Sequence, residues 1–169
     1  MMLIISFAVI AVSVILDQIT KVIAFNDLKP IDIHPFIKGF IEFNYETNTG
    51  IGWGLLKGMR WLFVPVSCIA IILVIVVLIR YRKKLSPLLS VALAMIAGGG
   101  IGNQIDRIFR GEVIDFLNFQ FIDFPIFNVA DCFVSVGCVL AIIAIIFVDK
   151  WILFDGKDNK KASGEKNDK

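Results

Sequence analysis

Residues 61–79 read WLFVPVSCIAIILVIVVLI, and no charged side chain interrupts them. A helix of this length rises about 28 Å, which is close to the hydrocarbon thickness of a bilayer. Three further apolar blocks of similar length stand at residues 2–25, 88–105 and 129–148. Because strands with free edges are excluded from lipid, each block is expected to be a membrane-spanning helix.

The composition of the whole chain agrees with this interpretation. Of its 169 residues, 57% are hydrophobic and 19% are charged, and the mean hydropathy is +0.81. A soluble domain is about half apolar and a quarter charged, so a soluble enzyme, a disordered chain and a disulfide scaffold are excluded. The net charge of +2 gives no reason to expect a nucleic acid as partner. The sequence predicts an all-α polytopic membrane protein with four transmembrane helices in a single domain, residues 1–154.

Lysine and arginine indicate the orientation of these helices. The link between the second and third blocks is Arg80-Tyr81-Arg82-Lys83-Lys84, and six lysines follow the fourth block. Basic residues concentrate in cytoplasmic loops, so both termini are expected in the cytoplasm. Residues 26–60 and 104–128 then lie outside, and the polar tail 155–169 is expected to be a disordered cytoplasmic segment. The first block lacks a basic start and a cleavage pattern, which predicts a retained span.

The two outside segments have a pattern of their own. Residues 30–43 and 113–127 are rich in Phe and Ile and alternate partly with a period of two. This pattern predicts short strands that form a small extracytoplasmic sheet at the membrane face.

Charged side chains inside the apolar blocks need a reason, since each costs about 2.5–3.5 kcal/mol to insert. Asp17 and Lys21 are four residues apart on one helix face, which predicts an ion pair. In the third block, four glycines within residues 98–102 allow another backbone to come close. Asn103, Asp106 and Arg107 follow on one helix face, either as a packed interface with a paired Asp and Arg or as reactive groups.

Asp115 and Asp131 are the remaining carboxylates of interest, at the outer membrane surface. If two such groups lie close together, one keeps its proton while the other stays ionised, as in aspartic proteases. Two unrelated interfacial carboxylates are the alternative. The single histidine, His34, has no partner motif of a zinc or serine hydrolase, and the three cysteines fall in apolar stretches. No metal site is expected.

The polar and glycine motifs occur in one order along almost the whole chain. They are Asp17-Gln18-Ile19-Thr20-Lys21, Asn48-Thr49-Gly50, Gly99 with Gly102-Asn103-Gln104-Ile105-Asp106-Arg107, Val113-Ile114-Asp115-Phe116, and Phe127-Asn128-Val129-Ala130-Asp131. In this order the chain resembles bacterial lipoprotein signal peptidase, the type II signal peptidase. One departure is that Ile51 and Gly52 stand where the family usually has two alanines, which puts packing and substrate preference there in doubt.

The resemblance implies a membrane aspartyl endopeptidase that cleaves prolipoproteins just before a diacylglyceryl-modified cysteine and needs no cofactor. It implies four transmembrane helices with a small outside sheet, in the bacterial cytoplasmic membrane. The family's catalytic aspartates fall on Asp115 and Asp131. Its supporting and substrate-binding positions fall on Asp17, Lys21, Asn48, Gly50, Gly99, Asn103, Asp106, Arg107, Asn128 and Ala130. The implied partners are lipid-modified prolipoproteins, membrane lipids and the inhibitor globomycin, and a monomer is expected.

Two other classes of membrane protein compete with this interpretation. In a small transporter or binding protein, Asp17, Lys21 and Asp106 would line a polar path through the membrane. A lipid-headgroup transferase or phosphatase would need a basic cluster or a carboxylate set facing phosphate, and only Arg107 and Arg110 come close.

Overall fold

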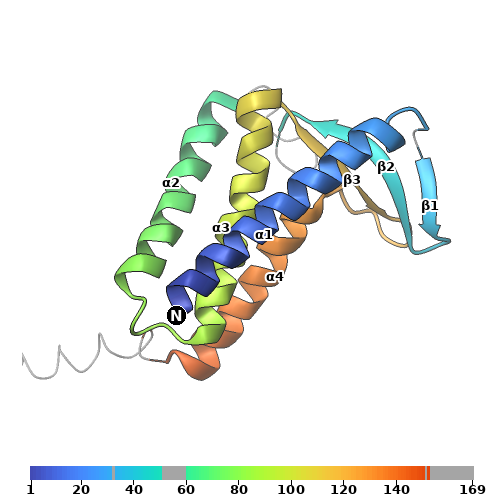
Figure 1. Cartoon of the computed structure of the whole chain (residues 1–169). Coiled ribbons are helices and arrows are strands. Elements are labelled where there is room, and N and C mark those ends of the chain that lie inside the picture. The colour runs from blue at the N-terminus through green and yellow to red at the C-terminus, as the bar shows by residue number, and fades with distance from the viewer. Residues whose placement is uncertain (32, 51–59, 151, 153–169) are drawn as a thin grey trace, which may run out of the picture.

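The computed structural model describes residues 1–31, 33–50, 60–150 and 152. The predicted tail, 155–169, and the pair Ile51 and Gly52 lie outside these residues. The described chain forms helices α1 (Met2–Ile23), α2 (Arg60–Arg80), α3 (Pro87–Ile105) and α4 (Val129–Ile143). Three of them continue as π-helical turns, at Ala24–Leu28, Asp106–Arg110 and Ala144–Val148. The helices form one bundle with a sheet at one end (Figure 1).

Three of the predicted spans are helices long and apolar enough to cross a membrane. In the described part of the chain these helices run over Met2–Leu28, Pro87–Arg110 and Val129–Val148. The apolar stretch of α2, Val64–Arg80, is shorter. The structure therefore shows three candidate membrane helices where the sequence predicts four spans.

Helix α1 buries polar side chains and exposes apolar ones, the reverse of a helix in a soluble protein. Its buried residues lie three or four apart on one face, and most of them are polar: Ser6, Ile10, Ser13, Asp17 and Lys21. Its other faces expose large apolar side chains such as Ile4, Ile15 and Ile19. A helix that hides polar groups and exposes apolar ones is suited to lipid on its outside and to a polar interior.

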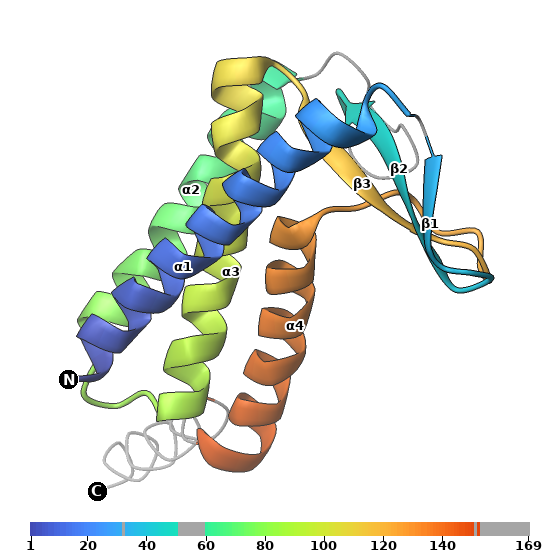
Figure 2. The ribbon, with the colours of Figure 1, turned by 45° about the vertical axis from the view of Figure 1, so that its right-hand side comes forward.

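Helix α3 lies in the middle of the bundle and packs against α1, α2 and α4 (Figure 2). It begins at the N-cap Ser86, whose hydroxyl accepts a hydrogen bond from the Leu89 amide at 3.1 Å, with Pro87 next. The buried carboxylate of Asp149 accepts from the Ser86 amide at 3.0 Å, which ties the end of α4 to the start of α3. Small residues let the backbones approach, and an added Cβ at Gly99 would overlap the carbonyl oxygen of Ala130.

The sheet confirms the strands predicted for the outside segments. Strands β1 (Ile33–Ile37), β2 (Ile41–Asn48) and β3 (Val113–Phe119) pair antiparallel in the order β1-β2-β3. Gly111, with φ of 89°, ends the last turn after α3 and lets the chain enter β3.

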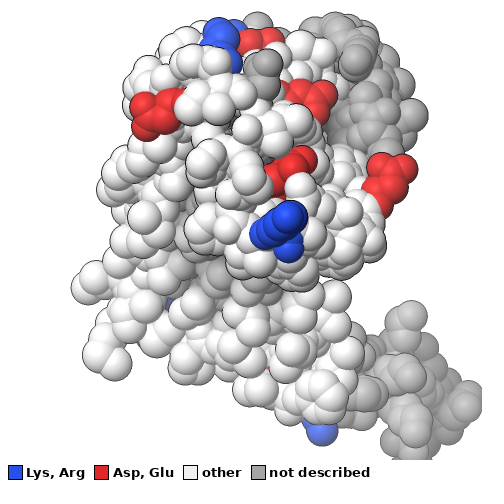
Figure 3. All heavy atoms as spheres, turned by 90° about the vertical axis from the view of Figure 1, so that its right-hand side faces the viewer, with Lys and Arg blue, Asp and Glu red and all other residues white. Residues whose placement is uncertain are grey.

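The sheet and the chain's N-terminus lie at opposite ends of the bundle. The N-terminus and the α2–α3 link are together at the far end from the sheet (Figures 1 and 2). Figure 3 shows the face of the molecule on the side of the sheet. Charged side chains gather there at the sheet end, and the surface of the helices below is nearly uncharged. An uncharged trunk between two charged ends matches the profile of a bilayer.

The glycines of α3 give a matched test of this packing. In Gly99→Ala the new Cβ meets the Ala130 backbone, and we expect the free energy of unfolding to fall by about 1–3 kcal/mol from overpacking. In Gly100→Ala the new Cβ meets only the flexible side chain of Ile71, at 3.0 Å, so little loss is expected. Thermal unfolding of both variants in detergent measures the difference. Equal midpoints would contradict the close α3–α4 contact at Gly99.

Candidate active site

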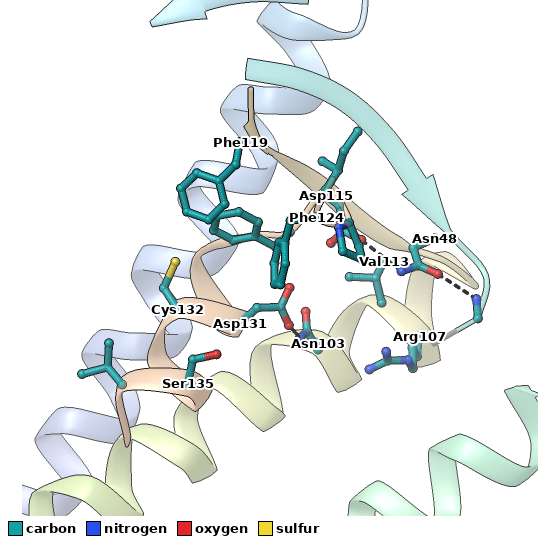
Figure 4. A pocket seen from close by; sticks show the side chains of 15 residues that line it. Asn48, Asn103, Arg107, Val113, Asp115, Phe119, Phe124, Asp131, Cys132 and Ser135 are labelled. Atoms are coloured by element: carbon teal, nitrogen blue, oxygen red, sulfur yellow. Dashed lines mark hydrogen bonds between the residues drawn. The ribbon is translucent and has the colours of Figure 1, made fainter. Parts of the chain in front are cut away.

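A cavity of about 570 Å³ lies where β3 meets the ends of α3 and α4 that are nearest the sheet. Asp115 of β3 and Asp131 of α4 both line it (Figure 4). One wall is apolar and comes mainly from β3, the loop after it and α4: Phe119, Phe124, Pro125, Ile126, Phe127 and Val136. Among the described residues, no group of three or more His, Cys, Asp or Glu is placed to hold a metal ion. The cavity thus pairs two carboxyl groups with apolar surface.

Asp131 is oriented by the first turn of its own helix. Asn128 is the N-cap of α4, and its side chain accepts a hydrogen bond from the Asp131 amide at 3.0 Å. In return Asp131 Oδ2 accepts from the Asn128 amide at 3.1 Å, which completes a capping box. The second oxygen, Oδ1, accepts from Asn103 Nδ2 at 2.8 Å. The positive end of the helix dipole also favours a carboxylate at this position.

Asp115 has a different environment, because it is almost fully buried. Only 4% of it is exposed, and its oxygens accept hydrogen bonds from Asn128 Nδ2 at 2.6 Å and from Asn48 Nδ2 at 3.2 Å. Burial, together with the nearby charge of Asp131, raises the pKa of Asp115 to about 7. Asp115 therefore holds a proton over a range in which ordinary aspartates have lost theirs.

Two buried amides link these carboxyl groups. Lys21 can only donate, and its ammonium lies 2.9 Å from Asn103 Oδ1, so the Asn103 Nδ2 group must point the other way, toward Asp131. Asn128 is oriented similarly: its oxygen accepts from the Asp131 amide, so its Nδ2 faces Asp115 and, at 3.1 Å, Asn103. The two amides can thus donate to both carboxyl groups at once.

Beneath the amides lies a fully buried ionic cluster. The Lys21 ammonium is 2.9 Å from Asp17 Oδ2 and 2.8 Å from Asp106 Oδ2, and all three side chains have no exposed surface. The pair predicted between Asp17 and Lys21 is confirmed. Asp106 completes the cluster from the other helix, so the ion pairs join α1 to α3.

Asp17 also reaches α4. Its Oδ1 accepts a hydrogen bond from the Ala130 amide at 3.0 Å, one residue before Asp131. Gly102 makes room for it, because a Cβ there would press on the Asp17 carboxylate. Asp17 therefore holds the first turn of α4 against α1.

Most of the predicted site residues are brought together in two layers. Asn48, Gly50, Asn103, Arg107, Asp115 and Asp131 line the cavity, while Asp17, Lys21, Asp106 and Asn128 are buried behind it. Gly50 is held through its amide, which donates to Asn48 Oδ1 at 2.9 Å. Gly99 and Ala130 contribute the close contact between α3 and α4.

One of the two alternatives left open for the helix face of Asn103, Asp106 and Arg107 was a paired Asp and Arg. Arg110, not Arg107, forms the arginine ion pair with Asp106, because its side chain lies one helical turn further along the same face. Sequence reasoning also missed Gln18, whose Nε2 donates to Asp17 Oδ2 at 3.1 Å and to Asp106 Oδ1 at 3.3 Å. The i, i+4 spacing of Asp106 and Arg110 in the sequence was the available signal for their ion pair.

Comparisons with known proteins give the class and then the family. A family model described as signal peptidase (SPase) II matches residues 9–147. The lipoprotein signal peptidase of Bacillus pumilus is 38% identical over 154 residues, which cover 90% of this chain and 94% of the relative. That of Brevibacillus brevis is 36% identical and covers 91% of this chain and 98% of the relative.

Solved structures agree with the sequence matches. A bacterial membrane enzyme solved by the in meso method superposes with a TM-score of 0.76 at 33% identity, over 83% of this chain and 87% of that one. A second such structure gives 0.74, also at 33% identity, over 85% and 93% of the two chains. The matches place this chain among the membrane peptidases. It belongs to the signal peptidase II family, as its motifs indicated.

The pKa of Asp115 should respond to its neighbour. In Asp131→Asn the nearby charge is removed, so we expect the pKa of Asp115 to fall below about 7 yet to stay above its usual range, because burial remains. The infrared band of the protonated carboxyl group, followed against pH, measures it. Asp115→Asn serves as the control that assigns the band, and an unchanged titration in Asp131→Asn would contradict the coupling.

The buried ammonium of Lys21 should contribute far more to the free energy of unfolding than the exposed one of Lys29. Lys21→Met leaves Asp17 and Asp106 buried with one cation fewer, and we expect a loss of about 3–5 kcal/mol in the free energy of unfolding. Lys29→Met is the matched control, since Lys29 is exposed and its ammonium lies over the rings of Phe25 and Tyr45. Thermal and denaturant unfolding in detergent distinguish them. Similar losses in both variants would show that the cluster does not stabilise the fold.

Proposed function

We propose that this protein removes the signal peptide from diacylglyceryl-modified prolipoproteins by cleaving before the lipidated cysteine, with Asp115 and Asp131 as the catalytic pair. One observation carries the proposal: both carboxyl groups line a single cavity, and buried amides orient each of them. The curated relatives are named lipoprotein signal peptidases, which supports the substrate class.

The two environments suggest different roles for the two acids. Asp131 sits at a helix N-terminus, and its two oxygens accept hydrogen bonds from the Asn128 amide and from Asn103, which leaves it oriented as a proton acceptor. Asp115 is more deeply buried, and its raised pKa keeps it protonated near neutral pH. Asp131 is then the general base and Asp115 the general acid.

The reaction follows from these two protonation states. The Asp131 carboxylate takes a proton from a water molecule, and the water oxygen attacks the carbonyl carbon of the scissile peptide bond. The Asp115 carboxyl group gives its proton to the carbonyl oxygen, which forms a neutral tetrahedral intermediate. As the C–N bond breaks, the proton on Asp131 passes to the nitrogen of the cysteine, and the hydroxyl proton returns to Asp115. The pair is regenerated without any further reactant.

The apolar wall fits a substrate that is anchored in the bilayer. The acyl chains of a lipid-modified cysteine lie in hydrocarbon, while its peptide bond is at the membrane surface. The cavity provides Phe124, Phe127 and Val136 beside the carboxyl groups. This arrangement supports binding at the depth of the bilayer surface rather than in bulk solvent.

The membrane arrangement is part of the same proposal. Helix α2, Arg60–Arg80, has 21 residues and so rises about 32 Å, enough for a fourth span. With the basic α2–α3 link in the cytoplasm, both termini lie there too, and the sheet and cavity lie on the outer face of the bacterial cytoplasmic membrane. A globomycin-type inhibitor would occupy the cavity, and the enzyme acts as a monomer without a cofactor.

The transporter alternative has no support from the cluster's geometry. Asp17, Lys21 and Asp106 have no exposed surface and satisfy one another's charges. Groups that line a path for ions or substrates need access to water.

Removal of either carboxyl group tests the catalytic pair. We expect Asp115→Asn and Asp131→Asn each to lower kcat by at least about 100-fold, because each removes one proton-transfer step. Asp123→Asn is the matched control, since Asp123 is an exposed aspartate in the loop after β3. The assay is cleavage of a diacylglyceryl-modified prolipoprotein by purified protein, with folding checked by thermal unfolding. Near-normal activity in a folded Asp115→Asn or Asp131→Asn protein would refute the assignment.

The pKa of Asp115 also predicts how the rate depends on pH. A carboxyl group with a pKa raised to about 7 supplies a proton below that pH and loses it above. We therefore expect kcat/KM to be maintained just below pH 7 and to fall about tenfold per pH unit above it, as the alkaline limb of the profile. A rate that keeps rising with pH through this range would contradict the role of Asp115 as the acid.

A further inference from the structure

We propose that Arg110 is a positioning residue for the peptidase reaction, because it holds Asp106, a carboxylate from which supports of both Asp115 and Asp131 extend. The inference rests on the proposed function and adds to it a residue that lies outside the cavity.

Arg110 is fixed by two contacts on two helices. Its Nη1 forms an ion pair with Asp106 Oδ1, one helical turn back, and donates to Gln18 Oε1 of α1 at 3.1 Å. The Gln18 Nε2 group in turn donates to Asp106 Oδ1 at 3.3 Å. Asp106 Oδ1 thus has two donors that hold the carboxylate in one orientation.

The other oxygen of Asp106 leads to both members of the catalytic pair. Asp106 Oδ2 lies 2.8 Å from the Lys21 ammonium, which holds Asn103, and Asn103 donates to Asp131. The same oxygen accepts from the amide of Ile114 at 3.4 Å, directly before Asp115 in β3. A rotation of the Asp106 carboxylate would disturb both branches.

Arg110 also balances the charge of the buried cluster, besides holding Asp106 in place. Asp17 and Asp106 carry two negative charges, and Lys21 and Arg110 carry two positive ones. Without Arg110 the buried cluster has an excess of one negative charge close to the catalytic pair. In a low-dielectric interior this excess acts over several ångströms and makes ionisation of Asp115 harder.

Arg110 exerts this effect from the opposite side of the sheet. It lines a second cavity of about 480 Å³ together with Tyr45, Glu112 and Ile114. Neighbouring residues of a strand point to opposite faces, so Ile114 of β3 faces this cavity while Asp115 faces the catalytic one. Glu112 and Tyr45 are the other titratable groups that face Arg110 here, besides Asp106. Arg110 therefore acts through Asp106 and does not contact the substrate.

The test compares Arg110→Gln, Arg110→Lys and the control Lys29→Gln. Lys29→Gln also removes one positive charge from the sheet end, but the Lys29 ammonium lies over the rings of Phe25 and Tyr45, whereas Arg110 pairs with Asp106. The pH profile of kcat/KM on a diacylglyceryl-modified prolipoprotein is measured for each purified protein. In parallel, the infrared band of the Asp115 carboxyl group is titrated without substrate.

We expect Arg110→Gln to lower kcat by about tenfold or more through misplacement of the catalytic pair. The alkaline limb of its kcat/KM profile and the titration midpoint of the Asp115 infrared band should both move to higher pH. Arg110→Lys should keep the positions of the limb and the band, and Lys29→Gln should match the wild type in every readout. A purely structural role would lower the unfolding temperature of Arg110→Gln without moving the limb, and that result overturns the proposal.

Two other outcomes are also decisive. If Arg110→Gln does not fold, Arg110→Lys decides: an unmoved limb supports the proposal, and a limb shifted despite the retained charge overturns it. If the wild type does not cleave the substrate, the proposed function fails, yet the infrared titration still tests Arg110. An Asp115 band at the same pH in Arg110→Gln and wild type then overturns this inference separately.

Discussion

The ammonium group of Lys21, enclosed between the carboxylates of Asp17 and Asp106, is the interaction on which the site depends. An unpaired charge in this position would be costly, so the three groups have to stay together once the helices are packed. It fixes α1 against α3, and through the Ala130 amide it also fixes the first turn of α4. The helices that carry Lys21, Asn103 and Asp131 are thus held together by one set of charges.

Between this cluster and the carboxyl groups of Asp115 and Asp131, the connecting side chains are neutral amides rather than further charged groups. Asn103 and Asn128 each have one oxygen and one NH₂ group, and the donors around them leave one orientation for each amide. Neutral amides can support two carboxyl groups without forcing both to ionise, which a second lysine in the same place would do. The raised pKa of Asp115 then follows from its burial and from the nearby charge of Asp131.

The sequence predicted those features that depend on local spacing. The Asp17–Lys21 pair follows from i, i+4 geometry, the strands from alternation in the outside segments, and the close helix contact from the glycines of residues 98–102. The approach of Asp115 to Asp131 was expected from the family resemblance, because no local rule brings a strand beside the start of a helix. The capping box at Asn128 and Asp131 could have been recognised from their spacing, but it was not.

Other features were beyond sequence reasoning for a physical reason. The Ala130 amide binds a carboxylate 113 positions away, and backbone donors leave no trace in side-chain patterns. The contact of Arg110 with Gln18 of α1 depends on which side of α3 faces α1, and that is set by packing.

The i, i+4 spacing of both ion pairs has a consequence for how the chain enters the membrane. Asp17 pairs with Lys21 within α1, and Asp106 pairs with Arg110 at the end of α3, so each helix carries its own counter-ion. The charges of Asp17 and Asp106 can therefore each be balanced within their own helix, without waiting for a partner helix. When the two helices meet, the Lys21 ammonium forms a second ion pair, with Asp106. Biogenesis of the buried cluster thus needs no step in which a bare charge crosses lipid.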